Sequence, residues 1–520
     1  MNGVVDLLAE LQDPACYPDR PHAVEIVQTH ISVVCLTDTR AYKLKKAVHL
    51  PFLDCREVVR RLHYCHEEVR LNRRLCHDVY LGVLVLVRTS QGLRFVPEPA
   101  TGMLEPTVVM RRLPAELMLD KLLEGHGVEP ARIEELARQV ARFHAGAERG
   151  GEVARHGSPE RLHELACANF TEIAGLPATG LPRALVLALE RATHADFARI
   201  LPVLERRAAA RHVVDGHGDL HTRNVCMTIP PTIYDCIEFE PAFRCGDVAT
   251  EIAFLVMDLR YRGALELART FLSAYVAASG DRELAQLMPA LVCYRAVVRA
   301  KVAAITSSAP ELTAKDREGA RGSAVRHLRL AAIATLEQGP RQWWITCGPP
   351  ASGKTTLCDL LAAGSGWDHI STDTVRKELA GIPKTRHADA AFYTREFSDR
   401  TYAEVLRRAG TSTAPVVLVD GNFPTAKRRA EAVAAAKACG AVPLLLHCEV
   451  PRAMAEERIV RRSSDPDSVS DAGLAELHRL LAAFEPPAEH EAKLCRVLGS
   501  GTPEHMLDGA LAQALRSRVP

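Results

Sequence analysis

The stretch GPPASGKTT, residues 348–356, decides how the second half of this chain is expected to fold. It fits the pattern G-x-x-x-x-G-K-[ST], follows the apolar run WWITC at 343–347 and opens the helical pattern KTTLCDLLAA at 354–363. In a strand–loop–helix unit of this kind, the loop's backbone N–H groups and the helix N-terminus surround phosphate oxygens. The pattern therefore predicts a phosphate-binding loop, and a chance glycine-rich turn is the alternative.

Residue type assigns roles within this loop. Lys354 is expected to reach the β- and γ-phosphates of ATP, and the Thr355 hydroxyl is expected to help hold Mg²⁺. The glycines let the backbone approach the phosphates closely. The residues predicted to bind the nucleotide are Gly348, Ser352, Gly353, Lys354, Thr355 and Thr356.

Two carboxylates are predicted at the ends of strands near this loop. Asp373 ends HISTD and Asp420 ends VVLVD, and these apolar runs alternate with helical segments. Such alternation indicates an α/β fold with a parallel sheet, which binds ligands beyond the carboxyl ends of its strands. Both carboxylates are therefore expected to face the phosphate loop. Each also precedes a helical segment, so helix N-capping is the alternative.

Arginines cluster further along, in ERIVRR at 457–462. Arg458, Arg461 and Arg462 share a helix face because they are spaced i, i+3 and i+4. They are predicted to clamp phosphate charge in a closing lid, and a solvated charged face is the alternative.

Four stretches, GPPASGKTTL, STDTVRKELAG, VVLVDGNFPTAKRR and ERIVRR, together resemble the P-loop kinase family that includes gluconate kinase, zeta toxin and the kinase domain of polynucleotide kinases. The resemblance covers about residues 340–500. It implies that Asp373 orients or deprotonates the acceptor hydroxyl and that Arg376 holds substrate phosphate. It also implies that Asp420 lies near Mg²⁺ and that Arg458 and Arg462 are lid arginines.

A second loop, VVDGHGDLHTRN at 213–224, carries a different pattern. Asp219 precedes Asn224 by five residues, and Asp235 follows Asn224 by 11 in the strand-like TIYDCIEF. Kinase catalytic loops have this spacing, with an Asp that orients the acceptor hydroxyl and an Asn and a later Asp that hold Mg²⁺. A zinc site at His217 and His221 and a merely structural polar loop are the alternatives.

The first half also offers a lysine and a glutamate for the phosphates. In AYK at 41–43, Lys43 shares a strand face with Ala41, and Lys45 lies on the same face. The helical stretch that follows offers Glu67 and Glu68 as the ion-pair partner. Glu68 is preferred because apolar residues continue its face of the helix. No G-x-G-x-x-G precedes this strand, since QTHISVV stands there.

HGDLHTRN with YDCIEF resembles the aminoglycoside phosphotransferase family, whose fold is protein-kinase-like and whose glycine loop is weak. The resemblance covers about residues 25–300 and extends to GDVATEIAFLVMDL, where it implies that Asp247 braces the catalytic loop. An aminoglycoside acceptor is weakly supported because no carboxylate cluster for a polycation is evident. The whole chain resembles the bacterial family described as a bifunctional aminoglycoside phosphotransferase-like and ATP-binding protein.

Charge and composition narrow the remaining possibilities. Up to Pro340 the chain has 42 basic and 42 acidic residues, and beyond it 23 and 22, so a general nucleic-acid binder is disfavoured. The basic run Lys427, Arg428 and Arg429 keeps a local patch possible. The 15 cysteines form no CxxC pair, which indicates reduced thiols. No signal peptide or membrane span is predicted, so a cytoplasmic protein is expected.

The connector LEQGPRQ at 336–342 predicts two domains. Residues 1–338 are expected to form an α+β, bilobal, protein-kinase-like domain, and residues 339–520 an α/β P-loop kinase domain. The predicted function is a bifunctional phosphotransferase dependent on ATP and Mg²⁺, acting on hydroxyls of small molecules. The alternatives are a polynucleotide 5′-hydroxyl kinase in the second half and a nucleotide-binding regulatory pseudokinase in the first. The oligomeric state is left open.

Overall fold

The computed structural model describes residues 3–50, 53–125, 127–176, 180–309, 312–383, 390–462, 473–488, 490–499 and 501–518. Backbone contacts group the chain into two compact units. The first comprises Met1–Glu164 and Ile200–Leu291, and the second comprises Leu165–Arg199 and Val292–Pro520. Helices α5 (Pro159–Gly175), α6 (Arg183–Ala209) and α10 (Leu284–Ser307) run through the points where this grouping changes.

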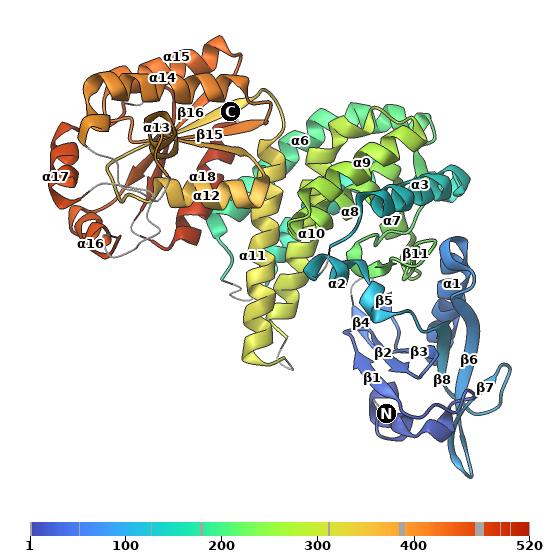
Figure 1. Cartoon of the computed structure of the whole chain (residues 1–520). Helices are drawn as coiled ribbons and strands as arrows, with labels where there is room; N and C mark the ends of the chain where they lie inside the picture. Colours follow the sequence, from blue (N-terminus) through green and yellow to red (C-terminus); the bar gives the residue numbers. More distant parts are fainter. Residues whose placement is uncertain are drawn as a thin grey trace. The chain divides into compact units, whose positions relative to one another are not determined.

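The first unit begins with an antiparallel sheet of six strands in the order β1-β2-β3-β8-β6-β7. Helix α1 (Val58–Cys76) packs on one face, where Ala41, Cys65, Val69 and Val108 share an apolar cluster. Figure 1 shows this sheet and α1 in blue. The strands are β1 (Glu25–Gln28), β2 (Ser32–Leu36), β3 (Arg40–Lys45), β6 (Tyr80–Thr89), β7 (Gly92–Pro97) and β8 (Met103–Arg111).

The opposite face of this sheet is covered by the N-terminal segment, which forms the short turns η1 (Gly3–Leu7), η2 (Glu10–Gln12) and η3 (Pro14–Cys16). The rings of Tyr17, Tyr42 and Phe95 contact one another there, with centroids 4.9–5.1 Å apart. Because side chains alternate along a strand, Tyr42 on this face leaves Lys43 and Lys45 on the α1 face. A two-stranded hairpin, β4 (His49–Leu50) and β5 (Leu53–Asp54), follows β3.

The rest of the first unit is mainly helical around a few short strands. The strand β9 (Val213–Asp215) pairs with β12 (Cys245–Asp247), and β10 (Val225–Cys226) pairs with β11 (Thr232–Ile233). The helices are η4 (Ala115–Leu117), α2 (Leu119–Glu124), α3 (Pro130–Gly146), α4 (Gly151–His156), η5 (Thr222–Asn224), α7 (Pro241–Arg244), α8 (Val248–Tyr261) and α9 (Leu265–Ser279).

The second unit contains a parallel sheet of five strands in the order β14-β15-β13-β16-β17. Its central strands are continuous apolar runs because helices cover both faces, as Figure 1 shows. Trp343, Trp344 and Ile345 of the central strand are fully buried. The strands are β13 (Gln342–Cys347), β14 (Asp368–Ser371), β15 (Val416–Asp420), β16 (Val442–Glu449) and β17 (Lys493–Leu498).

Helices α13, α14 and α15 contribute Val375, Val405 and Val433 to the core on one face of this sheet. Helices α11, α12 and α18 contact one another on the other side. The helices of this part are α11 (Ala314–Leu336), α12 (Lys354–Ser365), α13 (Thr372–Ala380), η6 (Ala390–Tyr393), α14 (Arg395–Thr411), α15 (Ala426–Ala438), α16 (Arg452–Arg462), α17 (Leu474–Ala483) and α18 (Pro503–Arg518).

The second unit also includes the helical segments before the P-loop part. Asp196 on α6 accepts hydrogen bonds from Gln338 Nε2 at 2.9 Å and from Arg518 at 2.9 and 3.2 Å. Arg329 on α11 pairs with Asp508 on α18 at 2.7 Å. These contacts join segments on both sides of position 338. The division at 338/339 stays a prediction about which fragments fold alone.

The predicted two-part fold class is confirmed, and one local prediction is wrong. The strand before Asp373 ends at Ser371, and Asp373 is the second residue of α13. Ser371 occupies the N-cap position, so Asp373 does not cap this helix either. The sequence analysis also missed β7 and β17, which lie at the edges of their sheets.

Candidate active sites

The first candidate site is centred on Lys43 of β3. Its ammonium donates to Glu68 Oε1 at 2.8 Å and to Asp235 Oδ1 at 2.5 Å. Glu68 is completely buried, whereas Glu67 pairs with Arg70 on the solvent-exposed side of the helix. The lysine thus joins the sheet, helix α1 and the segment after β11.

Lys45 lies beside Lys43 and shares its partner. It donates to Glu68 Oε2 at 2.6 Å and also to Glu238. Burial alone would raise the pKa of Glu68, but the charges of Lys43 and Lys45 outweigh burial and lower that pKa to about 2. Burial raises the pKa of Glu238. Glu68 therefore stays ionised between two ammonium groups.

Helix α1, which carries Glu68, is hydrogen-bonded to the loop after β9 and to the segment around Asp235. Arg74 donates to the carbonyl oxygens of Asp215 at 2.8 Å and Gly216 at 2.7 Å. Asn72 Oδ1 accepts from the backbone N–H of Cys236 at 2.9 Å. Three buried or half-buried hydrogen bonds thus hold α1 against the loop that follows β9 and against the segment next to Asp235.

The predicted catalytic loop follows β9. The Asn224 amide donates to the carbonyl oxygen and to Oδ2 of Asp219 at 2.9 and 3.0 Å. His221 Nε2 lies 3.3 Å from the same carboxylate oxygen. Across the hairpin, the Tyr234 N–H donates to the Asn224 carbonyl at 3.1 Å, which places Asp235 next to Asn224. Asp219, Asn224 and Asp235 therefore lie around one short hairpin.

Glu251 of α8 braces this loop. Its Oε2 accepts from the backbone N–H groups of His217 at 2.6 Å and Gly218 at 3.1 Å, and its Oε1 meets His144 Nε2 at 3.0 Å. A side chain at Gly216 would place its Cβ 2.4 Å from the Glu251 carboxylate, so only glycine fits there. Burial alone would raise the pKa of Glu251. The hydrogen bond from His144 and the charges of His144 and His217 outweigh burial and lower the pKa to about 2.

The role that the resemblance implied for Asp247 is corrected by these contacts. Asp247 pairs with the fully buried Arg207 at 2.8 and 2.9 Å and caps α8 by accepting from the Ala249 N–H. Its side chain is used by Arg207 and by the N-terminus of α8. The carboxylate that braces the loop is Glu251, one helical turn later. The spacing of one helical turn between Asp247 and Glu251 was the signal available in the sequence.

The zinc alternative for this loop gains no support from the contacts. His217 Nε2 meets the Tyr234 carbonyl at 2.9 Å, and its Nδ1 accepts from the Asp219 N–H at 3.2 Å. Burial lowers the pKa of His217. Within the described ranges, neither group of side chains able to share a metal ion includes His217 or His221. Their contacts fit a structural role.

The second candidate site is the loop between β13 and α12. Gly348 has φ +141° and Gly353 has φ +92°, conformations that other residues rarely adopt. A Cβ at Gly348 would lie 2.5 Å from the Cys448 carbonyl oxygen. Lys354 Nζ donates to the Pro349 carbonyl at 2.6 Å and to Ser352 Oγ at 3.3 Å. Burial lowers the pKa of Lys354.

Asp420 at the end of β15 faces this loop. Its Oδ2 accepts from Thr355 Oγ1 at 2.8 Å, and its Oδ1 accepts from Thr346 Oγ1 at 3.2 Å. His369, which the sequence analysis missed, lies 3.3 Å from Oδ2 and 3.2 Å from Asp359. Burial alone would lower the pKa of His369. The negative charges and hydrogen bonds of Asp420 and Asp359 outweigh burial, so the pKa of His369 is raised. Thr356 is exposed on the first turn of α12.

The remaining predicted residues lie on surrounding helices. Asp373 is half-buried on α13, and its charge acts on Lys354. Arg376 is buried, donates to the Phe392 carbonyl at 2.8 Å and stacks over Tyr393. Arg458 donates to the carbonyl oxygens of Ala351 and Gly499 at 3.1 and 2.7 Å, which ties α16 to the phosphate loop. Arg462 ends α16, and its side chain lies outside the described part of the chain.

Two family models match the chain. Residues 40–288 match the phosphotransferase enzyme family, APH, and residues 344–487 match the AAA domain family AAA_33. The first range contains the Lys43 site and the second contains the phosphate loop. Among the helices that the structure describes, none is long and apolar enough to span a lipid bilayer.

Three mycobacterial proteins are similar over most of the chain. The uncharacterized proteins Mb2027c of Mycobacterium bovis and MT2060 and Rv2004c of Mycobacterium tuberculosis are each 31% identical over 470 residues, 88% of this chain and 90% of theirs. A gluconokinase structure from Sinorhizobium meliloti 1021 is 20% identical over 34% of this chain and 93% of its own, with TM-score 0.26. A choline/ethanolamine kinase family structure from Mesorhizobium loti is 13% identical over 62% and 97%, with TM-score 0.36.

Proposed function

Since this chain belongs to the family of the three mycobacterial proteins and is a kinase that joins a phosphotransferase domain to a P-loop domain, we propose that it has two active centres. Each half transfers the γ-phosphate of ATP to a hydroxyl group of a small-molecule acceptor. Phosphoryl transfer asks a protein mainly for positioning and charge stabilisation. Both halves carry groups suited to those tasks.

The observation that carries the proposal for the first half is the position of Lys43 between Glu68 and Asp235. Glu68 orients the ammonium toward the phosphates. Asn224 and Asp235 offer the hard oxygen ligands that Mg²⁺ prefers, and they lie next to each other on the β10–β11 hairpin. Mg²⁺, when bound, would neutralise phosphate charge there. Asp219 orients the acceptor hydroxyl and accepts its proton.

In the second half, Lys354 is proposed to bind the β- and γ-phosphates, supported by Gly348, Ser352, Gly353 and Thr356 around the loop. Thr355 and Asp420, whose side chains meet at 2.8 Å, are proposed to hold Mg²⁺. Asp373 is proposed to act on the acceptor hydroxyl. Positive charge for the phosphates comes from Arg376, Arg458 and Arg462.

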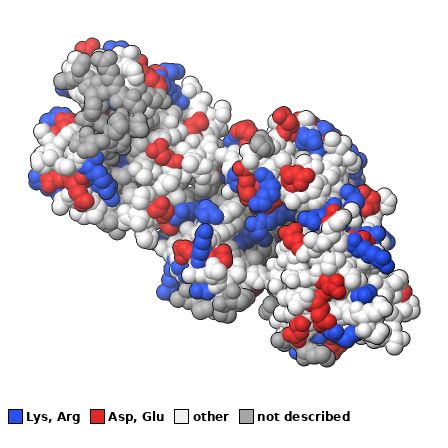
Figure 2. All heavy atoms as spheres, turned by 60° about the horizontal axis from the view of Figure 1, so that its bottom comes forward, with Lys and Arg blue, Asp and Glu red and all other residues white. Residues whose placement is uncertain are grey.

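One observation favours a second candidate, a polynucleotide 5′-hydroxyl kinase in the second half. Arg376 stacks over Tyr393 at 4.6 Å, Arg428 over Tyr402 at 4.8 Å and Arg400 over Phe397 at 5.3 Å. Arginine and aromatic side chains together suit bases and phosphates. Against it, the second half is near neutral, and acidic and basic side chains are interspersed over much of the face in Figure 2.

The test is a screen of metabolites and oligonucleotides with labelled ATP, run on the full chain and on two variants. Asp219→Asn should remove transfer to acceptors of the first half only, and Lys354→Met transfer to those of the second half only. An acceptor whose labelling survives both changes would contradict the proposal. Oligonucleotide labelling that falls steeply with salt would select the polynucleotide kinase. If Lys354→Met removes all labelling, the first half is a regulatory pseudokinase.

A further inference from the structure

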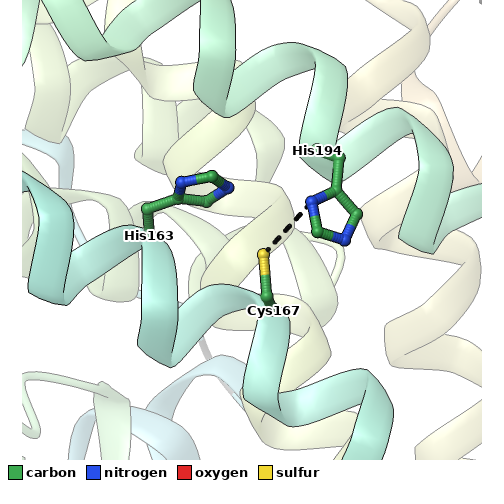
Figure 3. A group of neighbouring side chains, drawn as sticks. All are labelled: His163, Cys167 and His194. Carbon is green, nitrogen blue, oxygen red and sulfur yellow. Dashed lines mark hydrogen bonds between the residues drawn. The ribbon is translucent and has the colours of Figure 1, made fainter.

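A cluster of metal-ligating side chains lies on α5 and α6, outside both candidate active sites. Figure 3 shows His163 and Cys167 on one helix and His194 on the next, with Cys167 and His194 directed toward each other. Cys167 Sγ lies 3.5 Å from His194 Nδ1. One ligand atom from each of the three residues lies within 4.8 Å of the other two. Helix α5 is continuous, so it fixes His163 one turn before Cys167.

The distance between Cys167 and His194 matches two ligands of one zinc ion. Zn–S and Zn–N bonds of about 2.3 and 2.0–2.1 Å at a tetrahedral angle place sulfur and nitrogen about 3.6 Å apart. A plain thiol–imidazole hydrogen bond has a similar length, so this pair alone does not decide between the two. His163, a third possible ligand within 4.8 Å, favours a metal site over a simple hydrogen bond.

Glu190 lies on the same helix as His194, on α6. It precedes His194 by one helical turn, as His163 precedes Cys167 on α5. Its carboxylate is not part of the group whose ligand atoms all lie within 4.8 Å of one another. Residues spaced i and i+4 share a helix face. The two helices thus offer three ligands, and a structural zinc site uses four.

We propose that His163, Cys167 and His194 bind a zinc ion between α5 and α6, with a water molecule as the fourth ligand. Thiolate and imidazole ligands favour zinc over Mg²⁺, which prefers oxygen. His194 is exposed and Cys167 is half-buried, so the ion can enter from solvent. None of these three residues belongs to the phosphoryl-transfer sites. The ion would hold α5 to α6.

The test uses the full chain after treatment with a chelator. Zn²⁺ is titrated in competition with a chromophoric chelator, with Mg²⁺ in excess, and Co²⁺ is used in parallel to reveal a thiolate ligand by its charge-transfer absorption. One tight zinc ion per chain is expected. Removing a mere hydrogen-bonding partner of a ligand costs roughly 10–100-fold in affinity, so Cys167→Ser and His194→Ala should each lose at least that.

Three matched variants serve as controls. Cys439→Ser changes an exposed cysteine away from the cluster, and Cys358→Ala changes the thiol of the other metal-capable group, formed with His369 and Asp420. His221→Ala changes the catalytic loop. All three should retain the tight zinc ion. Loss in Cys358→Ala or His221→Ala, or equal affinity in wild type and Cys167→Ser, would overturn the proposal. Zinc-free melting curves show whether the variants fold. Zinc should raise the melting temperature of the wild type and of the three controls, but not that of Cys167→Ser or His194→Ala.

Discussion

The two candidate phosphate sites of this chain handle charge in opposite ways. In the first unit, Lys43 and Lys45 are paired with the buried Glu68 of α1 and with Asp235 and Glu238 of the segment after β11. In the second, Lys354 donates hydrogen bonds to the Pro349 carbonyl and the Ser352 hydroxyl, which lie five and two residues before it. Two partners of the first site's lysines lie nearly 200 positions along the chain, whereas those of Lys354 lie within its own loop.

This difference has an energetic consequence. Removing one partner of a buried ion pair strongly destabilises the folded protein, because the remaining charge is left uncompensated. The first site is therefore part of the fold's stability as well as of its chemistry. The backbone of a glycine-rich loop can lose its lysine without leaving a buried charge unpaired. Replacing the lysine of the second site should therefore lower the transfer rate with little change in the free energy of unfolding. Replacing a lysine of the first site should lower both.

The largest effect is expected at Asp219. Asp219→Ala should lower transfer by the first half by about 10²–10⁴-fold, the range for a positioned general base. Nucleotide binding should be nearly unchanged, because the role of Asp219 begins at the acceptor hydroxyl. Asp235→Ala should instead weaken Mg²⁺-dependent nucleotide binding. Nucleotide titration and rate measurement on the same samples distinguish the two, and identical binding defects would contradict the assignment.

Lys354→Ala should lower transfer by the second half by about 10²–10³-fold, as expected for loss of preorganised charge stabilisation. Its melting temperature should stay close to that of the wild type, because no carboxylate loses its partner. Lys427→Ala, an exposed lysine on α15, is the matched control. A rate change under about threefold would mean that the phosphate loop is not catalytic.

Lys45→Met should act through stability. It leaves Glu68 without one cation and Glu238 without its lysine in a buried setting, which should cost about 3–5 kcal/mol of unfolding free energy. Lys43→Met should reduce transfer more strongly than Lys45→Met, because Lys43 contacts Asp235. Chemical denaturation and rates measured on both variants decide which lysine serves the phosphates. Equal profiles would contradict this division.

The smallest effect is a pH dependence at Glu251. Its pKa is about 2 in the folded chain against 4.5 as the ordinary value, so its stabilising effect is present above about pH 4.5 and is lost as the pH falls toward 2. Glu251→Gln should be less stable than wild type at neutral pH, and the gap should narrow through that window. Denaturation at stepped pH values measures it, with the exposed Glu205→Gln as control. A gap that stays constant would show that charge is not involved.

The second site was predictable because its signal is contiguous. The strand, the phosphate loop and the helix after it follow from 21 consecutive residues, 343–363. The first site could not be assembled without knowing in which direction each side chain points. Alternate residues share a strand face, so sequence alone could not separate Lys43 from Lys45, and both in fact meet Glu68. The resemblance implied that Asp247 braces the catalytic loop, whereas Glu251, one helical turn later, accepts the hydrogen bonds from that loop.

Contacts between distant helices were out of reach for the same reason. Cys167 and His194 meet only because α5 and α6 pack together, and the sequence showed scattered thiols. The domain division at 338/339 is also still a prediction. Limited proteolysis should cut near Gly339 and leave two resistant fragments if it holds. The contacts of Asp196 with Gln338 and Arg518 are the ones that such a cut would put to the test.

The anchoring of α1 bears on how the first half could be inhibited. Arg74 and Asn72 hold the helix to the loop after β9 and to the backbone beside Asp235. A compound that needs this helix to move outward would have to break those bonds and the Lys43–Glu68 pair together. Selective inhibitors are therefore better sought among molecules that mimic the acceptor than among those that wedge the helix aside.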